Sequence, residues 1–353
     1  MLSVALVVLA LMGCAHSHND PDPMFTDYDA LSEEFIDHIN SLDTSWKAGQ
    51  NFPGKKEEDV RHLCGTLDPE PGDSLEADFD DDPPKIDYDT LPASFDARTK
   101  WPKCNSSISL IGDQDNCGNC WAFGSSYAIS DRYCINKMGL LQLSVQYITS
   151  CCSRAYRYNG CSGARIATAY SCWQKYGVPT GGQFGSNYGC QPYTIKDCPL
   201  KSESNGVTFP WCTGKSSKPS TSYTPPCSEC CDVGYSKKLN DDRHFAAKVY
   251  QLRRNNAPSI QAEIYARGPV TLTFSVYQDY LSYKSGVYKY KTGKYVGRHA
   301  VKIIGWGVEN NMPYWLGTNC WGQHWGNNGF FKFLRGSNHC GIESYGYAGI
   351  PKS

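Results

Sequence analysis

The residues best suited to chemistry lie in residues 114–126, which read QDNCGNCWAFGSS. The second cysteine of this stretch, Cys120, is followed directly by an apolar Trp-Ala-Phe run that favours a buried helix. A cysteine in the first turn of a helix has its thiolate stabilised by the helix dipole and by unpaired backbone N–H groups. Because the thiolate is the attacking form, this placement makes Cys120 a candidate nucleophile.

A nucleophilic cysteine needs a base, and residues 91–353 contain four histidines, His244, His299, His324 and His339. His299 lies in GRHAVKIIGWG, at the start of a strand-like apolar run that could hold its ring in one orientation. We expect His299 to be the base, and the other three to be solvated or structural.

Two amide side chains complete the candidate site. Asn319, in TNCWGQHWG, can accept a hydrogen bond from an imidazole ring, and Trp321 can shield that bond. Gln114 has a side-chain donor that could hold a developing oxyanion together with the backbone N–H of Cys120. The set predicts acyl transfer through a thioester.

The pair Cys117 and Cys120 permits two other interpretations. In a thioredoxin-like dithiol the aromatic residue precedes the first cysteine, whereas Trp121 follows the second. Zinc is the other rival, because Cys227 and Cys230 have the same spacing, but no matched pair of histidines follows. We therefore expect no metal and no cofactor.

The charges divide the chain into two segments. Residues 19–90 contain 21 Asp and Glu against 5 Lys and Arg, a balance of −16, whereas residues 91–353 contain 14 against 29, a balance of +15. We expect the segments to attract each other, with an unrelated acidic tail as the alternative. Nucleic-acid binding is not expected, because the basic residues are scattered apart from Arg253 and Arg254 and no binding motif accompanies them.

The N-terminus and the cysteines indicate a secretory or lysosomal route. Residues 1–15 are predicted to be a signal peptide, because they are apolar and end in small residues. The string LMGC also resembles a lipoprotein box, which would place a lipid on Cys14. No other segment reaches about 18 apolar residues, so no membrane span is expected. Sixteen of the 18 cysteines lie in residues 91–353, which favours disulfides.

The elements that must position these residues change in type along the chain. Apolar residues recur every three or four positions in residues 28–46, which predicts an amphipathic helix, and residues 120–135 predict a buried one. Residues 68–89, rich in Pro, Gly and Asp, predict an exposed linker, and residues 151–231 are loop-rich. Strands are predicted at residues 270–276, 286–288, 299–306, 314–316 and 330–334. The order implies an α+β fold of two lobes with a cleft between them.

These features resemble the papain family of cysteine peptidases, and within it the cathepsin B type. The matching motifs include LPASFDAR, CGNCWAFG, GCQPY, HAVKIIGWGVEN, NNGFFK and HCGIES, in that order along residues 91–353. The resemblance implies a helical left lobe, a β-barrel-like right lobe and a mature domain over residues 91–353. Residues 16–90, with WKAG and LCGT, resemble the inhibitory propeptide.

By position in these motifs, the resemblance assigns Cys120 as nucleophile, His299 as base and acid, Asn319 as the residue that orients His299, and Gln114 as oxyanion donor. His299 lies 179 residues beyond Cys120, more than the roughly 130 to 150 typical of the family. An insertion at about residues 190–231 accounts for the difference and corresponds to the occluding loop of cathepsin B.

The occluding loop of cathepsin B carries adjacent histidines that bind the C-terminal carboxylate of a substrate. Leu200 and Lys201 stand in their place here, and residues 190–231 contain no histidine. The resemblance therefore implies an endopeptidase with weak dipeptidyl carboxypeptidase action, although Lys201 could still attract a carboxylate.

The resemblance also implies the residues that bind substrate. Ser162-Gly163-Ala164 stands where the family has Asn-Gly-Gly, which keeps Gly163 for backbone pairing with substrate and narrows the wall of the cleft at Ala164. Ala300 matches the second subsite, and Trp321 lies beside the catalytic pair. Tyr345 stands where mammalian cathepsin B has an acidic residue, so we expect apolar or aromatic side chains to be preferred there over arginine.

Two further residues depart from the family pattern, because Asp115 and Arg298 each replace a usual glycine. The cation of Arg298 could lower the pKa of the adjacent imidazolium. Both changes leave open a catalytically silent homologue that acts as a binding protein, although all four catalytic positions are filled.

The resemblance implies disulfides Cys104–Cys134, Cys117–Cys161, Cys151–Cys227, Cys190–Cys231 and Cys198–Cys212. Cys152 has lost its usual partner, because Tyr156 falls near that position, and Cys172 or Cys230 could replace it. Cys320 and Cys340 are expected to be free thiols.

The remaining expectations concern modification and partners. Asn105 begins an Asn-Ser-Ser glycosylation acceptor. The resemblance implies protein and peptide substrates, the chain's own propeptide as an intramolecular inhibitor, cystatin-type inhibitors and a monomeric state.

Overall fold

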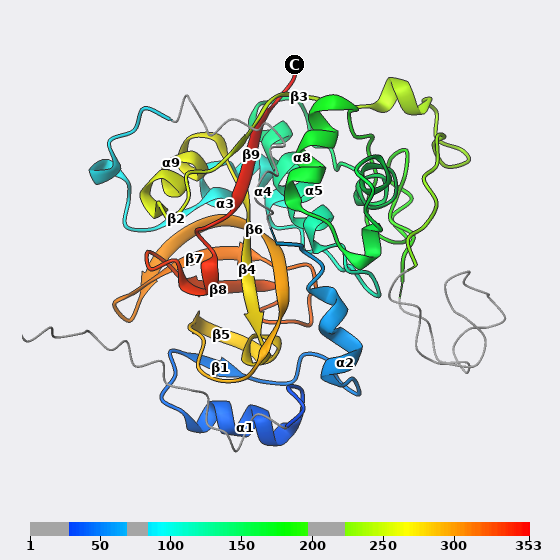
Figure 1. Cartoon of the computed structure of the whole chain (residues 1–353). Coiled ribbons are helices and arrows are strands. Elements are labelled where there is room, and N and C mark those ends of the chain that lie inside the picture. Colours follow the sequence, from blue (N-terminus) through cyan, green and yellow to red (C-terminus); the bar gives the residue numbers. More distant parts are fainter. Residues whose placement is uncertain (1–27, 69–83, 197–222) are drawn as a thin grey trace, which may run out of the picture.

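The computed structural model describes residues 28–68, 84–196 and 223–353. Figure 1 shows helices α5 and α8 with β9 and β3 running beside them, strands β4 to β8 on the other side, and the N-terminal segment with α1 and β1 against the far end of the strands. The α-helices are α1 Glu33–Ser41, α2 Glu57–Val60, α3 Ala97–Lys100, α4 Asn105–Ile108, α5 Cys120–Ile135, α6 Val145–Tyr147, α7 Ser153–Ala155, α8 Ile166–Lys175 and α9 Ala257–Arg267. The strands are β1 Trp46–Ala48, β2 Phe95–Asp96, β3 Ala246–Gln251, β4 Val270–Tyr277, β5 Tyr283–Tyr288, β6 Tyr295–Glu309, β7 Met312–Thr318, β8 Phe330–Leu334 and β9 Gly346–Pro351.

Shorter helical turns connect these elements. They are η2 Arg61–Leu63, η3 Tyr88–Thr90, η4 Pro102–Cys104, η5 Ile148–Cys152, η6 Gly160–Ser162, η7 Leu239–Asp242, η8 Gln278–Ser282 and η9 His339–Gly341.

The helix predicted in the acidic segment is confirmed, but α1 is shorter than the periodic pattern. It begins after Ser32, whose Oγ accepts a hydrogen bond from the backbone N–H of Phe35 at 3.2 Å. Such a cap supplies one acceptor for the unpaired N–H groups of the first turn. Phe35 and Ile39 are fully buried, so the apolar face of α1 is covered by the rest of the protein.

The acidic segment continues as an edge strand of the large sheet. β1 pairs antiparallel with β5, with Trp46 opposite Gly286. The indole Nε1 of Trp46 donates to the backbone oxygen of Lys289 at 2.9 Å, and its ring lies 5.2 Å from that of Tyr288. The WKAG motif therefore fastens the N-terminal segment to the strands.

Helix α5 has the bounds predicted from sequence and is almost wholly buried. Its charged residues are paired in the interior: Asp131 accepts from Lys302 Nζ at 2.9 Å, and Arg132 lies 2.9 Å from Glu263. A buried charge without a partner would be strongly destabilising, so these pairs allow a polar helix to cross the core. The position of Cys120 at its first residue is thus fixed from several sides.

The five predicted strand runs all lie in β4 to β8. The described strands follow the order β1-β5-β8-β7-β6-β4-β9-β3, and β2 pairs with β6. β1 and β3 are the two ends of this path, so the sheet is open, and the barrel-like description is corrected in that respect. The fold is α+β, as expected.

Helix α8 is a regular element within residues 151–231, the segment expected to be loop-rich. Ile166, Ala169, Tyr170 and Trp173 recur at spacings of three or four and are fully buried. Their periodicity is short and interrupted by Ser and Cys, which hid it among the surrounding loops.

Several predictions lie outside the described residues. These are the signal peptide, most of the linker, the disulfide Cys198–Cys212, and Leu200 and Lys201 of the insertion. Within the described residues, no helix is long and apolar enough to cross a membrane.

Five disulfides join described cysteines. Four are pairs that the resemblance implies, and the fifth settles the alternatives for Cys152 in favour of Cys172. Cys230 is free and exposed, and Cys320 and Cys340 are free as expected. The four other bonds are Cys104–Cys134, Cys117–Cys161, Cys151–Cys227 and Cys190–Cys231.

Candidate active site

Cys120 is the first residue of α5 and is fully buried. Its Sγ lies 3.1 Å from Oγ1 of Thr66, a residue of the acidic N-terminal segment. Burial raises the pKa of the Cys120 thiol, and the hydrogen bond with Thr66 opposes this shift. Burial of the sulfur under this segment therefore raises the thiol pKa by more than the expected stabilisation of the thiolate would lower it.

His299 lies in β6 and Asn319 follows the end of β7. The imidazole Nε2 of His299 lies 2.7 Å from Oδ1 of Asn319. The same oxygen accepts from the backbone N–H of Cys320 at 2.8 Å. Because a backbone N–H can only donate, the side-chain atom facing both groups is the oxygen, and Nε2 must carry the proton.

This assignment leaves Nδ1 of His299 as the basic nitrogen. It has no hydrogen bond of normal geometry within the described part of the chain. The ring of Trp321 lies 4.5 Å from the imidazole and covers it. The pair His299–Asn319 is thus oriented and shielded as its sequence context predicted, with one nitrogen left to take a proton.

Burial lowers the pKa of His299 to about 4, and the hydrogen bond with Asn319 opposes this shift. The neighbouring Arg298 is not the cause. Successive side chains of a strand point to opposite faces, and the Arg298 guanidinium donates to Thr273 Oγ1 at 2.8 Å instead. The imidazole is neutral at physiological pH in this state.

Gln114 is fully buried and its amide makes three contacts. Nε2 donates to the backbone oxygens of Leu63 at 3.1 Å and Cys117 at 2.6 Å. Oε1 accepts from Sγ of Cys320 at 3.1 Å. Both nitrogen contacts are to carbonyl oxygens, so the orientation of the amide is determined.

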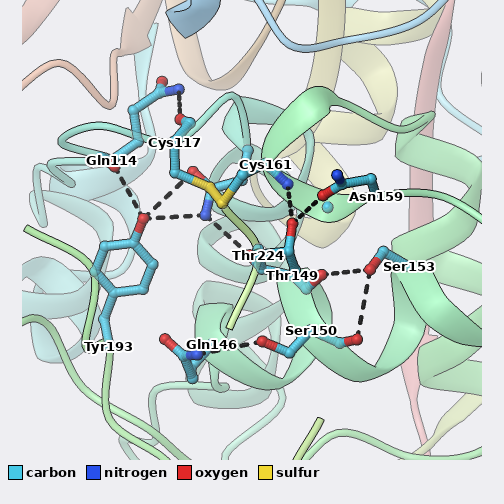
Figure 2. The surroundings of a disulfide bond; sticks show 12 residues. Gln114, Cys117, Gln146, Thr149, Ser150, Ser153, Asn159, Cys161, Tyr193 and Thr224 are labelled. Atoms are coloured by element: carbon cyan, nitrogen blue, oxygen red, sulfur yellow. Dashed lines mark hydrogen bonds between the residues drawn. A yellow bond between two sulfur atoms is a disulfide. The ribbon is translucent and has the colours of Figure 1, made fainter. Parts of the chain in front are cut away.

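The backbone around Gln114 is held by the braces drawn in Figure 2. The disulfide Cys117–Cys161 lies beside it, and the hydroxyl of Tyr193 donates to the Gln114 backbone oxygen at 2.9 Å. Tyr193 also accepts from Asn119 Nδ2 at 3.1 Å, directly before α5. Tyr193 therefore links the backbone of Gln114 to the start of α5.

Residues 63–67 of the N-terminal segment pass over this site. The backbone oxygen of Gly65 accepts from Ala164 N–H at 3.2 Å, and Leu67 N–H donates to Ala164 oxygen at 3.1 Å. Thr66 N–H donates to the backbone oxygen of Arg298 at 3.1 Å. The main chain of residues 65–67 thus occupies the groove between Ala164 and Arg298 of β6.

The approach of this segment requires glycine on both sides. A Cβ on Gly65 would lie 1.9 Å from the backbone oxygen of Gly118. A Cβ on Gly163, where φ is +110°, would lie 2.5 Å from the oxygen of Gly65. The glycines of LCGT and of the Ser-Gly-Ala wall therefore allow two backbones to meet.

The other predicted substrate-binding residues lie around the same groove. Ala300 is fully buried next to His299, and Tyr345 is buried with its backbone oxygen accepting from Thr273 N–H at 3.1 Å. Leu200 and Lys201 are outside the described residues, so their relation to the groove is not part of this geometry.

Two residues that contact the candidate catalytic residues were not identified from the sequence. Thr66 was read only as part of a propeptide motif, yet its hydroxyl contacts the candidate nucleophile. Cys320 was expected only to be free, yet its thiol holds the Gln114 amide. The signal for Cys320 was its position directly after Asn319.

One departure from the family pattern, Asp115, has a local explanation. Asp115 has φ of +49°, a left-handed conformation in which glycine is usual and which Asp tolerates better than most residues.

Asn105, the predicted glycosylation acceptor, begins α4 and is exposed, which leaves its side chain accessible. Among the described residues, no cluster of His, Cys, Asp or Glu could hold a metal ion.

Comparison with known proteins places this geometry in a family. Residues 91–350 match the model described as "Papain family cysteine protease", and residues 31–70 match "Peptidase family C1 propeptide". The chain is 41% identical over 322 residues to a "Gut-specific cysteine proteinase" of Caenorhabditis elegans, covering 91% of each. It is 39% identical to a "Cathepsin B-like cysteine proteinase 3" of the same organism, covering 100% of this chain and 91% of the relative.

Solved structures agree with the sequence relatives. The chain is similar to proCathepsin B S9 from Trypanosoma congolense, with a TM-score of 0.72, 31% identity, and coverage of 92% of this chain and 100% of that one. It shares the fold of procathepsin L 3 from Tenebrio molitor larval midgut, with a TM-score of 0.63, 19% identity, and coverage of 90% and 86%. The chain therefore belongs to the papain family of cysteine proteases, is cathepsin B-like, and includes the propeptide of that family.

Proposed function

We propose that the chain is the proenzyme of a cysteine endopeptidase, with residues 16–90 as inhibitory propeptide and residues 91–353 as peptidase domain. The observation that carries the proposal is the carbonyl of Leu63, held by Gln114 Nε2 at 3.1 Å. It puts a peptide carbonyl against the group that we assign to stabilise an oxyanion, in the groove that contains Cys120. The propeptide thus occupies the position that a substrate backbone would take.

In the proposed mechanism, Nδ1 of His299 takes the thiol proton of Cys120, and the sulfur attacks the substrate carbonyl carbon. Gln114 Nε2 and the backbone N–H of Cys120 stabilise the negative oxygen that forms. His299 then gives its proton to the leaving amine, and a thioester remains. Water, deprotonated by His299, attacks the thioester and releases the acid with the free thiol.

Asn319 has an orienting role in this mechanism. Its oxygen accepts from Nε2 of His299 throughout, which keeps Nδ1 available for proton transfer. Trp321 excludes water from this bond. Neither residue exchanges a proton with substrate.

Latency follows from the same contacts. Thr66 lies against the sulfur of Cys120, and burial favours the neutral forms of both Cys120 and His299. Withdrawal of the propeptide would return water to the pair, and the ionised couple would then become accessible.

The finer specificity follows from the residues around the groove. Gly163 and Ala164 would pair with the substrate backbone, and Ala300 with Tyr345 would favour an apolar or aromatic side chain in the second subsite. Dipeptidyl carboxypeptidase action would be weak, because Leu200 and Lys201 replace the histidines of the occluding loop.

The enzyme is proposed to be secreted or lysosomal and to act as a monomer. Residues 1–15 would be the signal peptide and Asn105 a glycan site. Protein and peptide substrates, and cystatin-type inhibitors, would be its partners.

Labelling with a thiol-directed epoxide tests the catalytic assignment. The processed protein should be labelled and should hydrolyse a fluorogenic peptide, whereas a Cys120→Ala variant should do neither. Cys230→Ala is the matched control, because Cys230 is free and exposed and has no part in the proposed mechanism. This variant should behave like the parent. Labelling without hydrolysis would favour the silent-homologue alternative, and equal labelling of Cys120→Ala would contradict the assignment.

A pair of peptides tests the proposed endopeptidase preference. One ends in a free carboxylate and the other in a C-terminal amide, with the same sequence otherwise. Similar kcat/KM values are expected for release of the C-terminal dipeptide. A strong preference for the free acid would show that the insertion still recognises a carboxylate.

A further inference from the structure

Arg298 lies beside the substrate groove with its guanidinium already oriented. One nitrogen, Nη2, donates to Oγ1 of Thr273 at 2.8 Å, and Thr273 is fully buried in β4. Thr273 in turn donates from its backbone N–H to the oxygen of Tyr345 at 3.1 Å. The guanidinium is therefore held by the peptidase domain itself, next to Tyr345, and does not depend on the propeptide for its position.

The other edge of this guanidinium faces the propeptide. Nε of Arg298 lies 3.3 Å from Oδ1 of Asp68, two residues beyond Thr66. The Asp68 backbone oxygen accepts from Arg165 Nε at 2.9 Å, so a second cation contacts the same residue. An acidic side chain in the groove is thus paired with a cation that remains when the propeptide leaves.

The position of Asp68 is informative because residues 65–67 run along the groove as a main chain. Ala164 bonds to both Gly65 and Leu67, and the Arg298 backbone oxygen bonds to Thr66. The side chains of a peptide held in this way occupy the spaces open to substrate side chains. Asp68 therefore marks a space that suits a carboxylate.

We propose that Arg298 makes the processed enzyme prefer Asp or Glu over the matching uncharged amides at the second or third residue before the scissile bond. This inference rests on the proposed peptidase function and adds a charge preference to it. Tyr345 supplies an apolar floor, and Arg298 supplies a cation at the rim. From the sequence, Arg298 was expected only to lower the pKa of His299. Its contacts with Thr273 and Asp68 support a role in substrate specificity instead.

The expected size of the preference follows from exposure. The Asp68 side chain is 73% exposed, whereas that of Arg298 is 13% exposed. Exposed ion pairs are weak, so we expect a preference of about two- to fivefold in kcat/KM. The effect should shrink at high salt, because the charges are accessible to ions.

Fluorogenic peptides that differ only by Glu against Gln, at either position, test the proposal on the processed enzyme at pH 6. The ratio of kcat/KM for Glu over Gln should be about two to five at one of the positions at low ionic strength, and fall towards one in 0.5 M salt. Arg298→Gln should bring the ratio to about one. Arg298→Glu should favour Lys over Gln at that position, and Arg253→Gln, a change of an exposed arginine, should keep the parent ratio.

A ratio of about one at both positions in the parent enzyme would overturn the proposal. So would a ratio that persists in Arg298→Gln. Cleavage of the Gln peptides separates these outcomes from a failure of the peptidase function, in which neither peptide would be cleaved. The salt dependence of the parent enzyme gives an answer even if the Arg298 variants fold poorly.

Discussion

The burial of His299 makes docking of the propeptide depend on pH. In the docked state the pKa of His299 is lowered from 6.5 to about 4, with desolvation as the main cause. When the propeptide opens and water returns, the pKa should recover towards its ordinary value. The open state therefore binds more protons than the docked state, and acid favours opening.

The sign and size follow from these two pKa values. The contribution of neutral His299 to docking is fully present above about pH 6.5 and is lost as pH falls from there towards 4. Linkage gives a factor of about 20 in the opening equilibrium between pH 7 and pH 5, or ~2 kcal/mol. This amount would add to any weakening from protonation of the propeptide carboxylates.

Hydrogen exchange of the Cys120→Ala proenzyme measures this equilibrium without self-processing. The amides of Thr66 and Leu67 are suitable probes, because they donate to Arg298 and Ala164 oxygens across the groove. After correction for the intrinsic exchange rate, their opening constant should rise about 20-fold from pH 7 to pH 5.

The matched control is His299→Gln on the same background, which cannot titrate and should show a much smaller rise. An opening constant that does not change with pH in the parent would refute the reasoning. An equal rise in both proteins would assign the effect to the carboxylates of the acidic segment instead of His299.

Three further outcomes are expected. Gln114→Ala should lower kcat of the processed enzyme by about 10²–10³-fold with little change in KM; a change confined to KM would contradict an oxyanion role. Lys302→Met should cost ~3–5 kcal/mol in urea unfolding, because it leaves Asp131 buried without its cation, and Asp131→Asn in the same protein should recover part of the loss. Trp46→Ala should weaken propeptide docking by ~3–5 kcal/mol through lost packing on Tyr288, seen as faster self-processing; an unchanged rate would show that β1 contributes little.

Local patterns in the sequence were enough for several elements. The bounds of α5 followed from the Trp-Ala-Phe run after Cys120 and from apolar residues that recur among polar ones up to Ile135. The five strand runs followed from β-branched and aromatic residues between turns. Short elements escaped prediction, because two- and three-residue strands such as β1 and β2 exist only through pairing with β5 and β6. An open or closed sheet likewise depends on which edges meet, and no local pattern records that.

For the candidate site, the sequence by itself determined which residue types are present and in what order. Cys120, His299, Asn319 and Gln114 could be named because their chemistry and their motifs are written in short stretches of chain. Only the tertiary structure decided which nitrogen of His299 is basic, since that depends on the Cys320 N–H that orients the Asn319 oxygen.

The pKa of His299 and the partners of Arg298 could be explained only from the tertiary structure. The sequence placed Arg298 beside His299 and so suggested a lowered imidazolium pKa, yet neighbours along a strand point to opposite faces. The fold directs Arg298 to Thr273 and Asp68, and the shift of His299 comes from burial under a segment more than 230 residues away in sequence. A pKa depends on everything that surrounds a group in space, and most of those surroundings come from distant parts of the chain.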